Sequence, residues 1–330
     1  MRKLLKQKRL DAVIFYNLDI ENLDGNYFYA AGTAALGIII IPANGEKKHL
    51  VPDMEKGRVK GKTYRLSIDN LKKYTQKYKK IGADLNELSV TSYRKLKRFS
   101  QAKIVNISDE MQELRSIKSE DEIRKIRKAC RITDDILHKT VKRFGEFTKE
   151  SHISAFMINE MLKMGCKPSF DPVVASGKAA SVAHHEFSNK IRKGFMIIDF
   201  GVRYKGYCSD MTRTFYVGKP GRKEIELYQH VLEVQKECIR LSSERTTKEL
   251  QDFAKEQLGT RFNHAIGHGI GINVHESVGG KLRPGTVFTI EPGYYIPEKL
   301  GIRIEDDVLM TKKGPQLLTR FPKNLLLLDQ

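Results

Sequence analysis

The segment MIIDFGVRYKGYCSDMTRTFYVG (196–218) contains two strand-like patterns separated by a short polar connection. The first pattern, MIIDFG (196–201), is an apolar run that closes on Asp199. The second, DMTRTFYVG (210–218), opens with Asp210 and alternates polar and apolar residues. A carboxylate that ends a hydrophobic strand loses hydration and is stable there only if an opposite charge lies close. Taken singly, each aspartate is typical of a turn or a cap, but together they predict two strands that bring two acids to one place.

A second informative stretch is HAIGHGIGINVHE (264–276), in which three of the chain's nine histidines are interleaved with three glycines. A lone histidine is more often a satisfied core or surface residue than a ligand. Glycines let the backbone approach whatever the neighbouring side chains hold. The grouping of His264, His268 and His275 among glycines therefore indicates a binding site.

Two later segments, EPGYYIP (291–297) and GIRIEDD (301–307), supply Glu291 and Glu305. Residues two apart in a strand share a face, so Arg303 and Glu305 are expected side by side. In isolation such a pair is a common surface ion pair. Its place after the other segments makes it a candidate part of the same site.

Together these segments provide four carboxylates and one imidazole. Such an oxygen-rich, mildly soft set of donors suits a pair of Mn, Fe, Co or Zn ions. Two cations about 3.5 to 4 Å apart can hold a hydroxide between them at neutral pH and polarise a carbonyl group, which is the chemistry of metal-assisted hydrolysis. The four carboxylates are Asp199, Asp210, Glu291 and Glu305, and the imidazole comes from the histidine segment 264–276.

Length and patterning indicate two domains. At 330 residues the chain exceeds one typical domain, and its first part has α/β patterning with strand-like runs such as AVIFY (12–16). Ser119 followed by Glu122 has the form of a capping box, so a new helix is expected to begin there. We therefore expect a smaller N-terminal α/β domain over residues 1–112 and a catalytic domain over 113–330, which together form an α+β protein.

The composition, with 40% hydrophobic and 30% charged residues, is that of an ordinary globular protein. No apolar run is long enough to span a membrane, and the basic start MRKLLKQKRL (1–10) is not followed by the apolar segment of a signal peptide. We expect a cytoplasmic protein without a membrane partner. Its four cysteines lack CxxC spacing, which argues against disulfides and against a structural zinc site.

The formal net charge is +19, and the first third contains the lysine-rich stretch LKKYTQKYKK (71–80). Basic fields attract phosphates. No recognised nucleic-acid motif accompanies the charge, so a solvated basic face is favoured over a nucleic-acid partner.

The ordered set Asp199, Asp210, His268, Glu291 and Glu305, together with the sequence around each of these residues, resembles the corresponding segments of the pita-bread metallopeptidase family. The resemblance covers nearly the whole chain, because residues from about 119 onward resemble the pita-bread catalytic domain and the preceding part resembles the first domain of Xaa-Pro peptidases. It implies that Asp199 binds one metal ion and that His268 and Glu291 bind the other. It also implies that Asp210 and Glu305 bridge both ions, and that Glu291 shuttles a proton.

The resemblance implies further roles near the reacting bond. His184, chosen over the adjacent His185 by counting forward from Ala175, matches a position that orients substrate. His275 matches a residue that contacts the scissile carbonyl and stabilises developing negative charge. The segment 264–276 departs from the family pattern at Ala265, where glycine is usual. The residues with candidate catalytic roles are His184, His264, His275, Glu291 and Arg303.

His264 matches a position that is characteristic of the proline-specific branch, and methionine aminopeptidases lack both this histidine and the preceding domain. The resemblance therefore predicts a dinuclear-metal peptidase that hydrolyses the bond preceding proline through a metal-bridging hydroxide. The activity would be that of an Xaa-Pro dipeptidase or, on longer peptides, of aminopeptidase P, and the short first domain favours the dipeptidase by analogy. Mn or Co is the expected metal, with Fe and Zn left open, and a homodimer is implied.

Two alternatives stay open at this point. A non-catalytic pita-bread protein could use its basic surface to bind nucleic acid or the ribosome, but relatives of that kind have typically lost metal ligands. Creatinase resembles the fold and works without metal. All five ligands are present here, which favours the peptidase.

Overall fold

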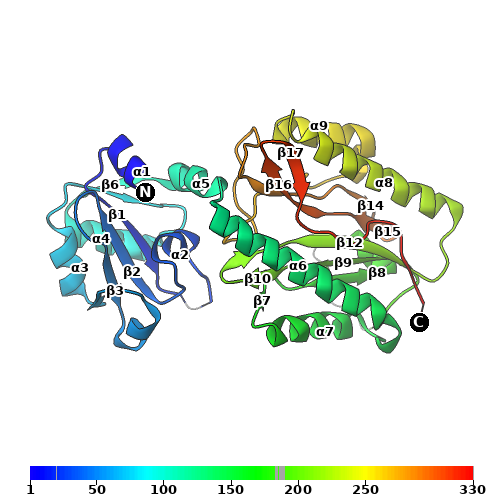
Figure 1. Cartoon of the computed structure of the whole chain (residues 1–330), viewed down its shortest axis with the longest axis horizontal. Helices are drawn as coiled ribbons and strands as arrows, with labels where there is room; N and C mark the ends of the chain where they lie inside the picture. The colour runs from blue at the N-terminus through cyan, green and yellow to red at the C-terminus, as the bar shows by residue number, and fades with distance from the viewer. Residues whose placement is uncertain (20, 183–184, 186–189, 330) are drawn as a thin grey trace. The chain divides into compact units, whose positions relative to one another are not determined.

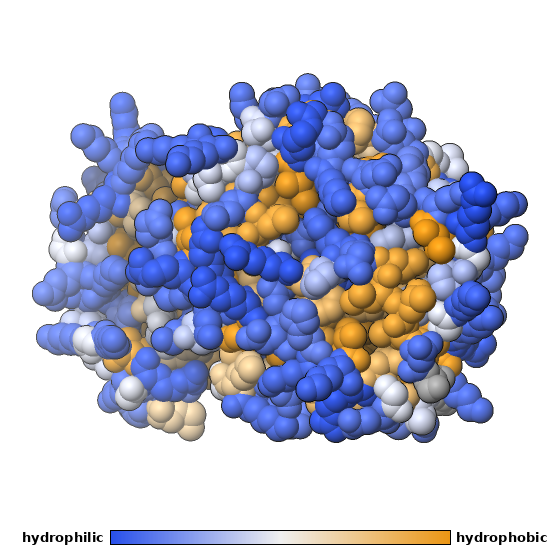
Figure 2. Space-filling model, turned by 45° about the vertical axis from the view of Figure 1, so that its right-hand side comes forward, coloured by the Kyte–Doolittle hydropathy of each residue, from blue (hydrophilic) through white to orange (hydrophobic). Residues whose placement is uncertain are grey.

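The computed structural model describes residues 1–19, 21–182, 185 and 190–329 (Figure 1). The chain divides into two compact units, Met1–Leu114 and Arg115–Gln330. Within the described ranges, no helix is both long and apolar enough to cross a membrane. The face seen in Figure 2 is largely hydrophilic, and apolar residues form several patches on it.

The first unit is built on a six-stranded mixed sheet with the order β4-β3-β2-β1-β5-β6. β1 pairs antiparallel with β2 and parallel with β5. Every residue of β1 and of β2 is buried, because helices cover both faces of the sheet. The strand predicted at residues 12–16 is confirmed as part of β1. The strands are β1 (Ala12–Asn17), β2 (Gly37–Pro42), β3 (Lys48–Val51), β4 (Thr63–Arg65), β5 (Lys80–Ala83) and β6 (Lys103–Asn106).

Helices pack on both faces of this sheet (Figure 1). α3 and α4 bury Leu71 and Leu96 in the core on one face. α1, α2 and α5 contribute Leu5, Tyr27 and Met111 to the core on the other face. The expected α/β arrangement of the first part is thus confirmed. Its helices are α1 (Arg2–Gln7), α2 (Gly25–Ala31), the 3-10 turn η1 (Asp53–Arg58), α3 (Ile68–Thr75), α4 (Val90–Ser100) and α5 (Ser108–Ser116).

The first long helix of the second unit, α6, begins with the capping box predicted from the sequence. The Ser119 side chain accepts a hydrogen bond from the Glu122 backbone, and the Glu122 carboxylate accepts one from the Ser119 backbone. The helices of this unit form two pairs, each packed on its own apolar core, with α6 and α7 in one pair and α8 and α9 in the other. The four helices are α6 (Glu120–Lys142), α7 (Glu150–Lys163), α8 (Arg222–Leu241) and α9 (Thr247–Leu258), and the short 3-10 turns of this unit are η2 (Phe144–Glu146), η3 (Gly177–Ser181) and η4 (Gly259–Arg261).

Strands lie between the two helix pairs (Figure 1). The largest sheet of this unit has four strands in the order β18-β12-β9-β8, and smaller sheets are formed by β13-β16-β17, β14-β15 and β11-β10-β7. The strands are β7 (Lys167–Pro168), β8 (Val173–Ser176), β9 (Gly194–Phe200), β10 (Val202–Tyr204), β11 (Tyr207–Cys208), β12 (Met211–Val217), β13 (Val287–Ile290), β14 (Gly293–Ile296), β15 (Leu300–Arg303), β16 (Asp306–Thr311), β17 (Gly314–Leu317) and β18 (Leu327–Leu328).

The pair β9 and β12 forms the centre of the four-stranded sheet. The strands are antiparallel, with Asp199 opposite Thr212 and Phe200 opposite Met211. The two strands predicted at 196–201 and 210–218 are therefore confirmed. Their register places Asp199, near the end of β9, close to the start of β12, which Asp210 precedes.

Candidate metal centre and active site

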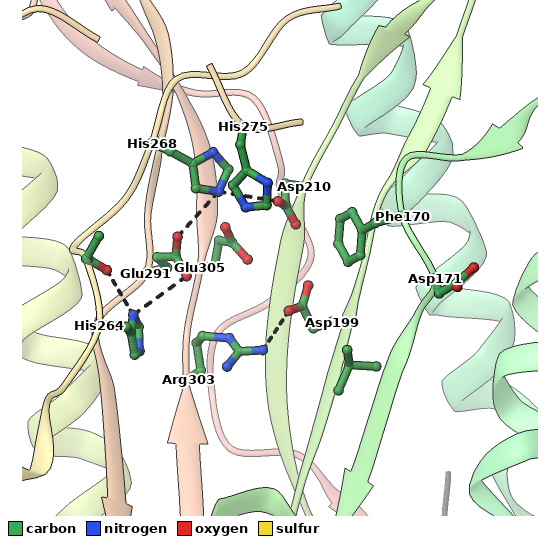
Figure 3. Close-up of a pocket in the computed structure, with 12 residues that line it drawn as sticks. Phe170, Asp171, Asp199, Asp210, His264, His268, His275, Glu291, Arg303 and Glu305 are labelled. Atoms are coloured by element: carbon green, nitrogen blue, oxygen red, sulfur yellow. Dashed lines mark hydrogen bonds and ion pairs between the residues drawn. The ribbon is translucent and has the colours of Figure 1, made fainter. Parts of the chain in front are cut away.

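A cavity of about 480 Å³ opens in the second unit, and its walls come from segments that lie far apart in the sequence (Figure 3). It contains every proposed metal ligand, and it contains each proposed catalytic residue that the structure describes. The position of His184 lies outside the described residues. The lining residues are Phe170, Asp171, Val173, Asp199, Asp210, His264, Ala265, His268, His275, Glu291, Arg303 and Glu305.

The side chain of Asp307 fixes the backbone of Asp210 at the end of the β9–β12 pair. The Asp210 N–H donates to Asp307 Oδ2 at 2.9 Å, which holds the residue at the entrance to β12. Asp307 also accepts a hydrogen bond from the thiol of Cys130 at 3.3 Å. Asp307, which no sequence pattern singled out, therefore orients the main chain beneath a proposed ligand.

The histidine segment reaches the cavity through a close backbone approach. The His268 N–H donates to Thr289 Oγ1 at 3.0 Å, and the Thr289 N–H donates to the His268 carbonyl at 2.8 Å. A Cβ on Gly267 would lie 2.0 Å from the Thr289 carbonyl oxygen, so only glycine fits there. This contact brings His268 beside Glu291, which follows β13.

The orientation of the His268 ring leaves one nitrogen free to act as a ligand. Its Nδ1 lies 3.0 Å from the Gly269 carbonyl, which can only accept, so Nδ1 carries the proton. Nε2 then presents its lone pair 3.5 Å from Glu291 Oε1 and 3.7 Å from Asp210 Oδ2 (Figure 3). A hydrogen bond from the second nitrogen is the usual way to orient a metal-binding imidazole.

The donor atoms fit divalent cations. Asp210, His268 and Glu305 each offer one ligand atom, and these atoms all lie within 4.8 Å of one another. Asp199 Oδ1 and Asp210 Oδ1 are buried and have no hydrogen-bond partner among the described residues. Buried carboxylate oxygens without a donor are costly unless a cation binds them. The carboxylate and imidazole donors suit divalent metal ions.

The acids in the cavity also perturb one another. Burial raises the pKa of Asp210 well above its ordinary value, and the negative charges of Glu305 and Asp199 raise it further. Burial, followed by the charges of Glu291 and Asp199, does the same to the pKa of Glu305. Burial raises the pKa of Glu291 to about 7. So many confined carboxylates stay ionised at neutral pH only when cations compensate their charge.

Arg303 connects the acids to the neighbouring hydroxyl groups. Its Nη2 donates to Asp199 Oδ2 at 2.6 Å, and its Nη1 donates to the Tyr295 hydroxyl at 3.0 Å. Its Nε donates to Thr212 Oγ1 at 3.2 Å, and this hydroxyl donates to Glu305 Oε2 at 2.6 Å. Arg303 ends β15, and Glu305 lies beyond the strand, so the expected link between them runs through Thr212 rather than along one strand face. Arg303 is also buried, unlike a surface ion pair.

The hydrogen bonds around His264 define its protonation. Its Nδ1 lies 2.9 Å from the Ala265 carbonyl and must donate, so Nε2 accepts from the Tyr295 hydroxyl at 3.0 Å. Burial lowers the pKa of His264 to about 4. The ring is therefore neutral and is held in place by Tyr295, which Arg303 orients in turn.

His275 and His268 lie together in the cavity, with ring centroids 4.2 Å apart (Figure 3). The neighbour of His184, His185, is described, and its Nε2 lies 3.0 Å from Glu150 Oε2. Three residues of the cavity wall, Phe170, Asp171 and Val173, were not predicted. They precede β8 or belong to it and carry no motif of their own.

A fully buried arginine, Arg213, holds the backbone next to the proposed ligand Glu305. Arg213 donates to the Glu305 carbonyl at 2.5 Å and to Asp306 Oδ1 at 2.7 Å. It also donates through Nε and Nη2 to the Phe321 carbonyl, at 3.1 and 2.9 Å. This one side chain joins β12, the Glu305 turn and the segment that leads to β18.

Comparison with known proteins covers both units. Residues 124–312 match the family described as metallopeptidase family M24, and residues 1–117 match the creatinase/prolidase N-terminal domain. The chain is 35% identical to the Xaa-Pro dipeptidase of Pyrococcus furiosus, over 91% of this chain and 92% of that protein.

Solved structures show the same similarity. The prolidase from Pyrococcus horikoshii OT3 superposes with a TM-score of 0.88 at 33% identity, covering 98% of each chain. The X-Pro aminopeptidase from Thermotoga maritima MSB8 superposes with a TM-score of 0.87 at 30% identity, covering 98% of this chain and all of the other.

Proposed function

We propose that this chain, which belongs to metallopeptidase family M24, hydrolyses the peptide bond that precedes proline. The resemblance inferred from the sequence is confirmed, as is the expected pita-bread fold with a preceding creatinase-type domain. The protein is a metallopeptidase, and the non-catalytic alternative is not favoured. The observation that carries the proposal is the gathering of two aspartates, two glutamates and His268 in one cavity.

Five residues would hold the metal ions in this proposal. Asp199 would bind one ion, His268 and Glu291 the other, and Asp210 and Glu305 both. The unpaired oxygens of the aspartates and the oriented Nε2 of His268 support this assignment. When bound, two divalent cations acidify a water molecule and polarise the substrate carbonyl. Mn or Co is the proposed metal.

Glu291 is the proposed carrier of the proton. A bond before proline has no N–H, and the ring nitrogen must gain a proton when the bond breaks. Glu291 lies in the cavity beside His268, where its carboxylate can take a proton from the attacking water and deliver it to that nitrogen. The carboxylate is regenerated by this transfer.

Three histidines are proposed to surround the substrate. His275 would donate to the scissile carbonyl oxygen as negative charge develops on it, and His184 would orient the substrate. His264, which Tyr295 holds in place, would form part of the wall against which the proline ring packs. Arg303 would act on substrate less directly, by fixing Asp199.

Several finer points belong to the same proposal. We favour a dipeptidase over an aminopeptidase, a homodimer, a cytoplasmic location and a domain boundary at residue 112. The relatives include proteins named for both activities. Rates on an Xaa-Pro dipeptide and on an Xaa-Pro tripeptide, measured with the same enzyme, decide between them, because a dipeptidase loses activity when the substrate is extended.

The metal centre is tested with Asp210→Asn, which keeps the shape of the side chain and removes its charge. We expect Xaa-Pro hydrolysis to be abolished. A purified, metal-loaded variant that keeps the wild-type rate would show that the assigned centre is wrong.

A further inference from the structure

Outside the metal centre, a glutamate is buried between two cations. Glu276 Oε1 accepts from Arg115 Nη2 at 2.5 Å, and Oε2 accepts from Lys118 Nζ at 3.2 Å. The exposed fractions of the three side chains are 6% for Glu276, 10% for Arg115 and 1% for Lys118. Burial opposes the charge of Glu276, but Lys118 and Arg115 together keep its pKa below the ordinary value. All three charges are thus removed from water, and each depends on the others.

This triad closes the loop that carries His275. The Gly269 N–H donates to the Glu276 carbonyl at 2.8 Å, and the Glu276 N–H donates to the Gly269 carbonyl at 2.8 Å. The Glu276 carboxylate also accepts from the Asn273 N–H at 3.1 Å. A Cβ on Gly271 would lie 2.7 Å from Glu276 Oε2, so the glycine leaves the space that the carboxylate occupies. The loop is therefore wrapped around the side chain of Glu276.

The two ends of this loop lie next to catalytic groups. Gly269 follows the proposed ligand His268, and Glu276 follows His275. His275 lines the cavity, whereas the Glu276 side chain is turned to the cation pair. The two side chains thus leave consecutive positions of the chain toward different surroundings, and the Glu276 backbone is held to Gly269 by two hydrogen bonds. Fixing Glu276 at this point therefore limits the directions that the His275 side chain can take.

We propose that Glu276, held by Arg115 and Lys118, is a positioning residue that fixes His275 over the scissile carbonyl. This inference rests on the proposed function, because His275 has a carbonyl to contact only if the protein is a peptidase. Glu276 touches neither substrate nor metal in this scheme. A displacement on the order of 1 Å at the reacting group lowers rates by about a hundredfold, so the anchor acts on kcat.

The experiment uses Glu276→Gln in the metal-loaded, full-length enzyme, with the wild-type protein assayed on the same Xaa-Pro dipeptide. Gln keeps the size of the side chain and one acceptor oxygen but leaves the two buried cations uncompensated. We expect kcat to fall about ten- to a hundredfold, with KM and metal content unchanged. Glu160→Gln is the matched control, because Glu160 is a buried glutamate that also pairs with two cations, Lys139 and Lys163, and none of these three residues lines the cavity. It should keep the wild-type kcat.

A double-mutant cycle with His275→Ala separates positioning from general support. If Glu276 acts through His275, adding Glu276→Gln to His275→Ala changes kcat by less than about twofold. If the same large factor appears in both backgrounds, Glu276 does not act through His275 and the inference is wrong. Should Glu276→Gln fail to fold, Lys118→Met serves in the same cycle with the same two outcomes.

Hydrogen exchange gives a readout that does not depend on activity. In Glu276→Gln, with and without Mn²⁺, the amides of Gly269, Asn273 and Glu276 should exchange faster, while that of Thr289 should not change. Unchanged protection of the three loop amides would overturn the inference. A wild-type enzyme that fails to cleave Xaa-Pro substrates would instead refute the proposed function, and it would leave the loop result to be judged on exchange alone.

Discussion

Replacing Gly267 with alanine should damage the metal centre without touching any ligand. The new Cβ would lie 2.0 Å from the Thr289 carbonyl oxygen, whereas real Cβ contacts under 3.0 Å essentially do not occur. The His268 and Thr289 backbones must therefore move apart by at least about 1 Å. That movement weakens the two hydrogen bonds between them and carries His268 away from Glu291.

The expected loss can be estimated from general magnitudes. Forcing an extra methyl group into a packed site destabilises a protein by about 1 to 3 kcal/mol. A misplacement on the order of 1 Å costs about a hundredfold in rate. We expect Gly267→Ala to lower kcat/KM on an Xaa-Pro dipeptide about a hundredfold and to reduce the bound metal, as measured by elemental analysis.

The control for this variant lies in the same region of the chain. Nothing lies within 4 Å of a Cβ built on Gly279, so Gly279→Ala should keep the wild-type rate and metal content. If Gly267→Ala also keeps both, the close backbone approach does not position His268, and the account of this segment is wrong.

Three further predictions concern stability. Ser119→Ala removes the cap of α6 and should lower the free energy of unfolding by about 1 kcal/mol with kcat unchanged; equal denaturation midpoints for variant and wild type would contradict this role. Hydrogen bonds from Lys139 and Lys163 lower the pKa of Glu160 from 4.5 to about 2. The contribution of Glu160 to stability is therefore complete above pH 4.5 and is lost as the pH falls toward 2. The difference in melting temperature between wild type and Glu160→Gln should shrink over that range, and a constant difference would rule this out. Removal of metal with a chelator should lower the melting temperature by several degrees, because metal at a hundredfold above its Kd stabilises a protein by about 2.7 kcal/mol. If calorimetry gives the same melting temperature in EDTA as in Mn²⁺, the buried acids bind no cation.

The sequence predicted the parts of the fold that depend on local pattern. The strands around Asp199 and Asp210 were identified because apolar runs and alternation reflect burial directly. The cap at Ser119 was identified because its two hydrogen bonds join residues three apart. In both cases the residues that interact lie close together in the chain.

The supporting residues of the site could not be predicted in this way. Glu276 meets Arg115 across 161 positions of sequence, and Asp307 meets the Asp210 backbone across 97. Neither pair has a periodic signature, since only the packing of separate segments brings its members together. Tyr295 has no signature in the sequence either, because its role comes from the hydroxyl that lies between His264 and Arg303. The roles proposed for the metal ligands and histidines stay predictions that the variants above address.

The buried guanidinium of Arg213 has a consequence for how the protein is made. It is satisfied only when the Phe321 carbonyl reaches it, and β12 gains its parallel neighbour only when Leu327 and Leu328 arrive. Both groups leave the ribosome after Glu305, the last proposed ligand to be synthesised. A nascent chain that already contains all five ligands can pair Arg213 with Asp306, but it still lacks the carbonyl that accepts from Arg213 Nε, so maturation of the centre must wait until this late segment has docked.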